Sequence, residues 1–285
     1  MLGACEYAPW RMGQEQRSGE TRPELNPLRS CRAPRCGFAT KCHITYNAGV
    51  NASISQTEHP TLRGSLLVVA KQPAAGHTKT RLCPPLSGEM AAALYECFLL
   101  DTLDIMRRVH DVQCTIVHLH RDSEGYFRRL APDMALSQQK GDTLGERLVH
   151  LLGDALASGS GPAVVMNSDS PTLPAAYVDE AFERLDDSDV VLGPCLDGGY
   201  YLIGMKRLHP RLLLDVQMST PHVLEDTLVL ASELDLSVAL LPEWYDVDTI
   251  AELDHLRSEI AIFDDDDTGA GGAAHTRRYL TQIRW

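Results

Sequence analysis

The architecture of this chain is first indicated by residues 65–82, which read SLLVVAKQPAAGHTKTRL. The opening residues, Ser65–Ala70, form an apolar run that is typical of a buried strand. A polar segment follows from Lys71 to Pro85, and its glycine and prolines predict a loop at the end of that strand. A long helix is then expected from about Gly88 to Val109, with Ser87 as its N-cap.

Strand and helix patterns alternate through the rest of the central part of the chain. Further strands are predicted at residues 112–119, 135–138, 163–167, 190–192, 200–205 and 236–241. Further helices are predicted at residues 121–130, 142–156, 175–185, 220–234 and 249–260. Alternating strands and helices are typical of βαβ units, so we expect a single Rossmann-like α/β domain with a mostly parallel central sheet flanked by helices.

The two ends of the chain differ from this patterned part, which spans residues 64–262. Residues 1–63 are rich in Arg, Pro, Ser and Gly and lack sustained periodicity, so we expect a flexible N-terminal extension. A translation start further downstream is an alternative for this segment. Residues 263–285 begin with an acidic run and continue with Gly and Ala, which predicts a solvated C-terminal tail.

Charge and composition argue against several classes of partner and site. The net charge of −13 disfavours nonspecific binding to nucleic acid or to anionic lipid. The apolar runs are too short to span a membrane and no secretory signal is recognisable, so we expect a cytoplasmic protein with reduced cysteines. We expect no structural zinc at Cys31, Cys36, Cys42 and His43, because these residues do not form two pairs with the usual spacing of zinc ligands.

Polar motifs follow four of the predicted strands, which end at Ala70, Asn167, Leu192 and Leu241. In parallel sheets, ligands bind outside the carboxyl ends of the strands. We therefore expect one site to collect all four motifs.

The first motif is the loop after Ala70, and its residue types suit phosphate. Backbone amides around a glycine can surround an anion, and Lys and Arg can neutralise a diphosphate. A P-loop is excluded because Thr78, not Gly, precedes the lysine. The predicted nucleotide- and phosphate-binding residues are Lys71, Gly76, Lys79, Thr80 and Arg81. We expect Lys79 and Arg81 to be exposed without ligand; a merely solvated basic loop is the alternative.

Two aspartates are candidate ligands of Mg²⁺ or Mn²⁺. Asp169, in the motif SDSPTLP, closely follows a buried strand, where a carboxylate can hold a cation that bridges nucleotide phosphates. Asp248 lies in the motif WYDVDT, whose two aspartates flank Val247 and face one side of an extended segment. For both residues, capping of the following helix is an open alternative.

The motif GPCLDGGYYLIG at residues 193–204 predicts a substrate-binding turn. Asp197 could orient an acceptor hydroxyl or act as its base, and Gly198 and Gly199 would permit close approach of a ligand. Tyr200 could stack on a sugar or base, although a tight hairpin with its tyrosines in the core explains the motif equally well.

A last motif, GDTLGER at residues 141–147, contributes a further candidate. Asp142 is expected to cap a helix. Arg147 could reach the donor or the acceptor, with a surface ion pair as the alternative.

Taken in order, KQPAAGHTKTRL, GDTLGER, NSDSPTLP, GPCLDGGYYLIG and WYDVDT resemble the DUF2064 family of glycosyltransferase-A-like (GT-A) proteins over about residues 64–260. Some members are named as glycosyltransferases associated with arsenosugar biosynthesis or with radical-SAM genes. The resemblance implies the nucleotide-diphospho-sugar transferase fold, which also serves 2-phospholactate guanylyltransferases. It further implies a metal-ligand role for Asp169 and a nucleotide-binding role for the loop 71–81.

These observations favour a metal-dependent glycosyltransferase. Asp169 and Asp248 would hold the metal, the basic loop would hold the nucleotide sugar, and Asp197, together with Asp169, would serve catalysis on a small-molecule acceptor. The alternative is a nucleotidyltransferase that joins an NTP to a phosphorylated small molecule. The single glycine of the loop, Gly76, favours glycosyl transfer over that reaction. A noncatalytic nucleotide-binding protein is the third possibility.

Overall fold

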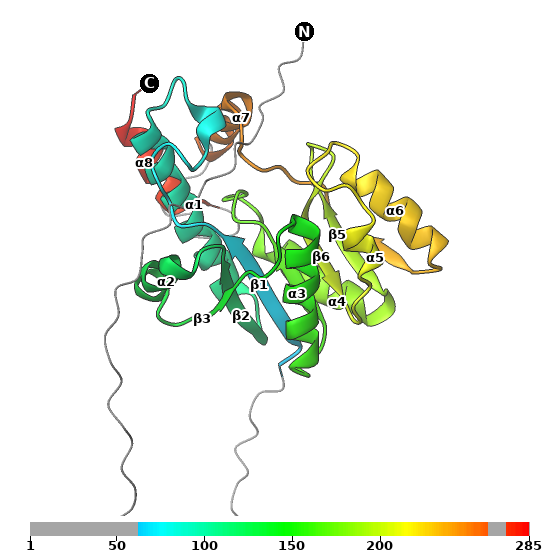
Figure 1. Cartoon of the computed structure of the whole chain (residues 1–285). Helices are drawn as coiled ribbons and strands as arrows, with labels where there is room; N and C mark the ends of the chain where they lie inside the picture. The colour runs from blue at the N-terminus through cyan, green and yellow to red at the C-terminus, as the bar shows by residue number, and fades with distance from the viewer. Residues whose placement is uncertain (1–61, 262–271, 285) are drawn as a thin grey trace, which may run out of the picture. The chain divides into compact units, whose positions relative to one another are not determined.

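The computed structural model of the protein describes residues 62–261 and 272–284 (Figure 1). All of them belong to the unit Gln56–Trp285. Their centre is a seven-stranded sheet with the strand order β3-β2-β1-β4-β6-β5-β7. The strands are β1 Gly64–Ala70, β2 Val112–His118, β3 Ala135–Gln138, β4 Ala163–Met166, β5 Val190–Pro194, β6 Tyr200–Met205 and β7 Val238–Leu240. The predicted α/β fold is thereby confirmed.

The direction of the strands fixes where the loops gather. Strands β1 to β4 pair in parallel, β6 runs antiparallel between β4 and β5, and β7 is parallel to β5. The carboxyl ends of β1, β4, β5 and β7 therefore lie at the same edge of the sheet. The four polar motifs lie at this edge, as predicted. Ligand sites of such sheets lie at the carboxyl ends of the strands.

Both faces of the sheet are covered, which explains the continuous apolar runs in its strands. Along β1, Leu66 and Val68 join the core on one face, whereas Leu67 joins the core on the other. Side chains of α1 Gly88–Arg108, α2 Glu124–Leu130, α4 Ala175–Asp187 and α7 Ile250–Ile260 belong to the first core. Side chains of α3 Leu144–Ala157, α5 Arg211–Leu214 and α6 Val223–Glu233 belong to the second.

The predicted helix cap Asp142 and the capping alternative for Asp248 are both wrong by one residue. Thr143 and Thr249, and not Asp142 and Asp248, are the N-caps of α3 and α7. Each threonine forms a capping box with a glutamate three residues later, a pairing that satisfies two backbone N–H groups at once. Asp248 is therefore not a helix cap. Ser87 caps α1 as predicted, and its Oγ accepts a hydrogen bond of 3.2 Å from the Met90 N–H.

The short helix α5 was not predicted, because four residues are too few for a periodic pattern. Helix α6 begins at Val223, three residues after its predicted start. The loop after β1 contains a 3₁₀ turn, Thr80–Leu82, and another 3₁₀ turn, Arg121–Ser123, precedes α2.

The C-terminal part of the predicted tail is instead a helix, α8 Ala274–Gln282, which packs against α1 (Figure 1). Both carboxylate oxygens of Asp101 in α1 accept backbone N–H groups of α8, from His275 and Thr276, at 2.9 Å each. Leu280 is 7% exposed. The prediction failed because the α8 cap comes from a distant residue.

Several predictions concern residues outside the described ranges: the N-terminal extension up to residue 61, the Cys31–His43 cluster and the acidic run 264–267. Within the described ranges, Cys83, Cys97, Cys114 and Cys195 are free thiols, as expected. Among the described helices, none combines the length and the apolar character that crossing a membrane requires.

Candidate functional site

Two adjoining pockets lie at the carboxyl edge of the sheet, and they share Arg81 and Asp248. We call the first the basic pocket; it has a volume of about 260 Å³. Its lining residues are Lys71, His77, Thr78, Lys79, Thr80, Arg81, Tyr95, Asp169 and Asp248. Most of the predicted phosphate-binding residues thus surround one cavity. Gly76 is not among the lining residues; it sits with φ +75° in the turn that shapes the loop.

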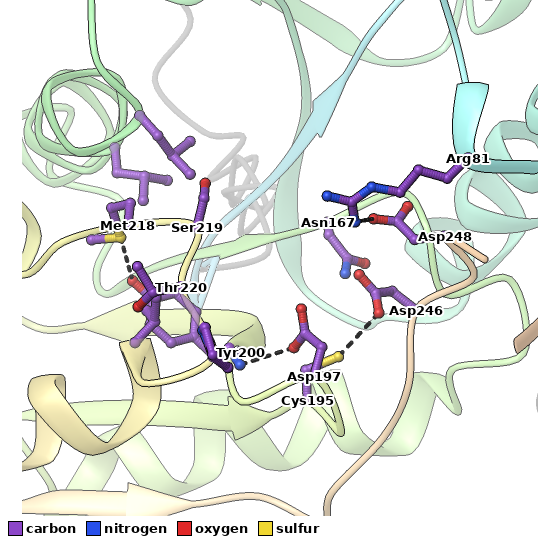
Figure 2. A pocket seen from close by; sticks show the side chains of 15 residues that line it. Arg81, Asn167, Cys195, Asp197, Tyr200, Met218, Ser219, Thr220, Asp246 and Asp248 are labelled. Atoms are coloured by element: carbon purple, nitrogen blue, oxygen red, sulfur yellow. Dashed lines mark hydrogen bonds and ion pairs between the residues drawn. The ribbon is translucent and has the colours of Figure 1, made fainter. Parts of the chain in front are cut away.

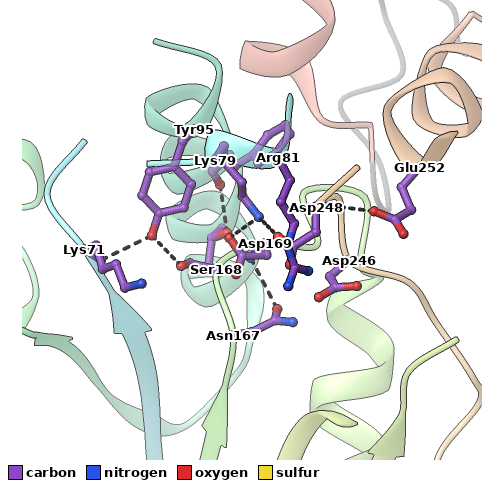
Figure 3. Close-up of polar contacts among 12 residues, drawn as sticks. Lys71, Lys79, Arg81, Tyr95, Asn167, Ser168, Asp169, Asp246, Asp248 and Glu252 are labelled. Atoms are coloured by element: carbon purple, nitrogen blue, oxygen red, sulfur yellow. Dashed lines mark hydrogen bonds and ion pairs between the residues drawn. The ribbon is translucent and has the colours of Figure 1, made fainter. Parts of the chain in front are cut away.

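Lys79 is the centre of the basic pocket (Figure 3). Its ammonium lies 2.7 Å from Asp169 Oδ1 and 2.7 Å from Asp248 Oδ1, and its side chain is only 5% exposed. Burial acts to lower the pKa of Lys79, but the charges of Asp169 and Asp248 outweigh it and hold the pKa above its usual value. The expectation that Lys79 is exposed without ligand is therefore wrong, because the two carboxylates bind it.

The other cations of the loop are accessible. Lys71 is exposed, and the side chain of Arg81 is 74% exposed, as predicted. The Arg81 guanidinium lies 3.6 Å from Asp248 Oδ2, at the boundary between the two pockets. Burial raises the pKa of Asp248, but Lys79 and Arg81 lower it more, so the carboxyl titrates below its usual range.

A buried hydrogen-bond chain holds the loop to the sheet. The Lys71 N–H donates to Tyr95 Oη at 3.2 Å, Tyr95 Oη is 2.9 Å from Ser168 Oγ, and Ser168 Oγ donates to the Val69 carbonyl at 2.9 Å. Burial and the nearby charge of Asp169 raise the pKa of Tyr95 to about 12. These contacts fix the basic loop beside Asp169. The sequence analysis missed Tyr95, because it lies in a helix pattern that reads as core.

We call the second cavity the acidic pocket; it has a volume of about 510 Å³ (Figure 2). One part of its wall is apolar and the other carries carboxylates. Its lining residues are Arg81, Leu144, Leu148, Asn167, Cys195, Asp197, Gly199, Tyr200, Met218, Ser219, Thr220, Pro221, Val223, Asp246 and Asp248.

The turn that carries Asp197 is tightly constrained. Asp197 is exposed, and its Oδ1 accepts a hydrogen bond of 2.9 Å from the Gly199 N–H. Gly198 has φ +88°, and a Cβ there would lie 1.9 Å from the Pro221 carbonyl oxygen. Gly198 thus allows the turn to approach the segment at Pro221, which is a structural role in addition to the predicted substrate contact.

The segment 244–249 delivers carboxylates to both pockets. The Val247 N–H donates to the Asp169 carbonyl at 3.0 Å, and the Val247 side chain is fully buried. Asp246 and Asp248 therefore both face the site, as the alternation predicted. Asp248 binds Lys79, whereas Asp246 lies beside Cys195, whose thiol donates to its Oδ1 at 3.4 Å.

Asp246 was not predicted to be a site residue, and its environment is unusual. Burial, together with the charges of Asp197, Asp248 and Asp169, raises the pKa of Asp246 to about 6. The ligand-type atoms of Cys195, Asp197 and Asp246 lie within 4.8 Å of one another. The signal for Asp246 in the sequence was its place two residues before Asp248.

Two residues that were predicted to contact a substrate, Arg147 and Tyr200, make contacts within the protein. Arg147 donates to the backbone carbonyls of Gly141 and Asp142 at 3.0 Å each, and it does not line either pocket. Its guanidinium therefore holds its own loop. Tyr200 does line the acidic pocket, and its Oη donates to Met218 Sδ at 3.7 Å. Tyr201 packs in the core, as the hairpin alternative predicted.

Asp169 and Asp248 fit a cation site, because the Lys79 ammonium already stands between their oxygens as a cation would. Carboxylate oxygens are preferred ligands of Mg²⁺ and Mn²⁺. Another described group of ligand-type side chains, Asp101, Asp104 and His275, lies at the contact of α1 with α8. There both Asp101 oxygens already accept backbone N–H groups, which gives the group a structural function.

Comparison with known proteins finds a family profile and solved structures that are similar to this chain. Residues 102–220 match the profile of DUF2064, described as an uncharacterised protein conserved in bacteria. The chain is 30% identical to a solved structure from Desulfovibrio desulfuricans G20 that carries the provisional name nucleotide-diphospho-sugar transferase. The alignment covers 76% of this chain and 98% of that one, with a TM-score of 0.69.

Two further solved structures are more distant. A 4-diphosphocytidyl-2C-methyl-D-erythritol synthase from Anaerococcus prevotii DSM 20548 is 13% identical, covering 70% of this chain and 97% of its own, with a TM-score of 0.48. A cytidylyltransferase from Leptospira borgpetersenii serovar Hardjo-bovis is 13% identical, covering 78% and 96%, with a TM-score of 0.47. No curated protein matches the chain in sequence.

Proposed function

Because the chain belongs to the DUF2064 family and has a nucleotide-diphospho-sugar transferase-like fold, we propose that it is a glycosyltransferase that moves a sugar from a nucleotide-sugar donor to a small-molecule acceptor. The observation that carries the proposal is the pair of adjoining pockets with opposite charge, joined at Arg81 and Asp248. A transferase of this kind needs one site for an anionic donor and a neighbouring site for the acceptor.

The basic pocket is the proposed donor site. Lys71 and Arg81 present exposed positive groups that can bind the diphosphate, and Arg81 can do so with two parallel hydrogen bonds. Thr80 lines the same cavity. The phosphate oxygens also offer new acceptors to the Lys79 ammonium, which is now shared by the two carboxylates. The residues that neutralise the donor thus come from one loop.

Asp169 and Asp248 are the proposed metal ligands. Mg²⁺ or Mn²⁺ held by them would neutralise the diphosphate and stabilise the departing nucleoside diphosphate. The two aspartates also position the Lys79 ammonium.

The proposed reaction takes place where the two pockets meet. The acceptor hydroxyl oxygen attacks the anomeric carbon of the sugar and forms the new C–O bond. The bond from that carbon to the diphosphate oxygen breaks, and the nucleoside diphosphate leaves with the electron pair. Asp197, which lines the acidic pocket, orients the hydroxyl and takes its proton.

Nucleotidyl transfer from an NTP to a phosphorylated small molecule is the second candidate, because the basic pocket suits the phosphates of an NTP equally well. The two reactions release different products. Glycosyl transfer releases a nucleoside diphosphate, whereas nucleotidyl transfer releases pyrophosphate.

The test is a thermal-shift screen of UDP-, GDP-, ADP- and dTDP-sugars against the corresponding NTPs, with and without Mn²⁺. A ligand that binds the folded protein raises its apparent stability by mass action. We expect a nucleotide sugar to give the largest shift and to release nucleoside diphosphate when acceptors are added. Pyrophosphate release from an NTP, with no reaction of any nucleotide sugar, would contradict the proposal.

A further inference from the structure

The acidic pocket restricts the chemistry of the molecule it can hold. We propose that the acceptor bears a hydroxyl group and an apolar face and carries no phosphate or carboxylate group. The inference rests on the function proposed above, because it treats the acidic pocket as the acceptor site.

The charges of the acidic pocket disfavour an anion. Asp197, Asp246 and Asp248 line it, and Arg81 is the one positively charged side chain among the described residues of its lining. That guanidinium lies 3.6 Å from an Asp248 oxygen, so Asp248 partly neutralises its charge. Asp197 and Asp246 are left to face the cavity, and an anionic acceptor would be repelled by both.

The opposite wall of the acidic pocket is apolar. Leu148 and Val223 are each 5% exposed, whereas Leu144 on the same wall is 41% exposed. Met218 lines the same cavity, and its Sδ accepts a hydrogen bond from Tyr200 Oη (Figure 2). Small-molecule sites combine such an apolar surface with a few polar groups that fix orientation, so this wall favours an acceptor with an apolar face.

The pocket is preformed, because backbone contacts hold its two walls together. The Gly198 N–H donates to the Cys195 carbonyl at 3.0 Å, and the Gly198 carbonyl accepts from the Leu224 N–H at 3.0 Å. Gly198 also lies directly against Pro221. The turn with Asp197 is thereby fixed to the segment that leads into α6. The volume of about 510 Å³ is within the usual range for a small-molecule site.

Charge also separates the two substrates. Lys71, Lys79 and Arg81 attract phosphate to the basic pocket, while the carboxylates repel it from the acidic pocket. A phosphorylated acceptor would therefore compete with the donor for the basic pocket. A neutral or cationic acceptor would be directed to its own site, because specificity arises from repulsion of the wrong ligand as well as from attraction of the right one.

The test uses three alcohols of the same chain length: 1,6-hexanediol, 6-aminohexan-1-ol and 6-hydroxyhexanoate. Their binding to the full chain is measured by saturation-transfer NMR with the basic pocket filled by UDP, GDP, ADP or dTDP, whichever binds. We expect the diol and the amine to bind, and the carboxylate to bind at least about tenfold more weakly, because like charges oppose it. Equal binding of 6-hydroxyhexanoate and the diol would overturn the inference.

Variants assign the effect to the pocket. In Asp197→Asn/Asp246→Asn, 6-hydroxyhexanoate should bind within about threefold of the diol, because the repelling charges are gone. The matched control Asp122→Asn/Asp235→Asn removes two exposed charges outside the pocket and should leave the wild-type ranking unchanged. Circular dichroism checks folding, and the single variant Asp197→Asn, at an exposed position, replaces the double variant if that fails to fold. Full discrimination in the folded pocket variant would also overturn the inference.

The closing experiment separates this inference from the proposed function. Binding of UDP, GDP, ADP and dTDP is measured first, and a protein that binds none of them contradicts the proposed donor site. The ranking of the three alcohols on a protein that does bind one of them tests the acceptor chemistry alone.

Discussion

The basic and the acidic pocket lie side by side at one edge of the same sheet, but the charges around their carboxylates differ. In the basic pocket, Asp169 and Asp248 are compensated by the buried ammonium of Lys79. In the acidic pocket, burial and the charges of neighbouring carboxylates together raise the pKa of Asp246 to about 6. The difference arises because all three cations come from the loop after β1, and of these three only Arg81 also lines the acidic pocket. In a chain with a net charge of −13, the local arrangement of charge determines what each site can bind.

Replacement of Asp169 should have the largest effect on this arrangement. Asp169→Asn keeps the size of the side chain but removes the charge that holds a divalent cation, so we expect Mn²⁺ affinity and most activity to be lost. Asp248→Asn should be nearly as damaging, because Thr249, and not Asp248, caps α7. Mn²⁺ titration followed by electron paramagnetic resonance measures both variants. A folded Asp169→Asn protein with wild-type Mn²⁺ affinity would exclude the metal assignment.

The exposed cations of the basic pocket should contribute to donor binding and little to folding. Lys71→Ala or Arg81→Ala should weaken nucleotide binding by about 1.5–3 kcal/mol, the range for hydrogen bonds with a charged partner. Calorimetric titration with UDP and with nucleotide sugars measures the change. Arg129→Ala, which removes an exposed cation outside both pockets, is the control. Unchanged affinity in both pocket variants means that the nucleotide binds elsewhere.

Lys79 should differ from Lys71, because it is buried between two carboxylates. Lys79→Met should lower the free energy of unfolding by about 1–3 kcal/mol, less than for a fully buried pair because Asp169 and Asp248 remain partly exposed. Mn²⁺ should restore part of this loss by taking the place of the ammonium. Urea denaturation with and without Mn²⁺ measures both effects, and Lys71→Met serves as the exposed control. Equal stability of the two variants would contradict the structural role of Lys79.

Loss of the Asp246 charge should stabilise the folded protein, whereas loss of the Lys79 charge should destabilise it. The pKa of Asp246 is raised on folding. Its protonated carboxyl group therefore stabilises the wild type fully below pH 4, and this stabilisation is lost as the pH rises through about 6. Asp246→Asn has no such loss and should exceed the wild type in stability by about 1–2 kcal/mol at pH 7.5. Urea denaturation of metal-free protein between pH 4 and 8 tests this. A constant difference between the two proteins over that range would show that the titration of Asp246 is not responsible.

The smallest effect is expected from the N-terminal extension. A chain that starts at Leu62 should keep its melting temperature and its nucleotide affinity, because the extension lacks the apolar periodicity from which a core could form. Differential scanning calorimetry and UDP titration check this. A large loss of stability would show that residues 1–61 belong to the folded unit.

The sequence was most informative where local rules operate. The apolar run of β1 and the periodicity of α1 with its Ser87 cap were predicted to within a residue or two, because burial and capping depend on neighbours in the chain. The collection of the four loops at one edge also followed from the sequence, since strand direction in βαβ units determines where loops lie.

Only the tertiary structure determined which charges meet. The Lys79 ammonium binds Asp248, 169 residues away, and Asp101 caps α8 from 174 residues away. The sequence identified the basic loop and the aspartates but not that Lys79 is buried or that Asp246 faces Asp197, because electrostatic pairing depends on distance in space and on desolvation. Thus the sequence by itself determined the fold and the edge at which the site forms, whereas packing determined the compensation of the basic pocket and the excess negative charge of the acidic one.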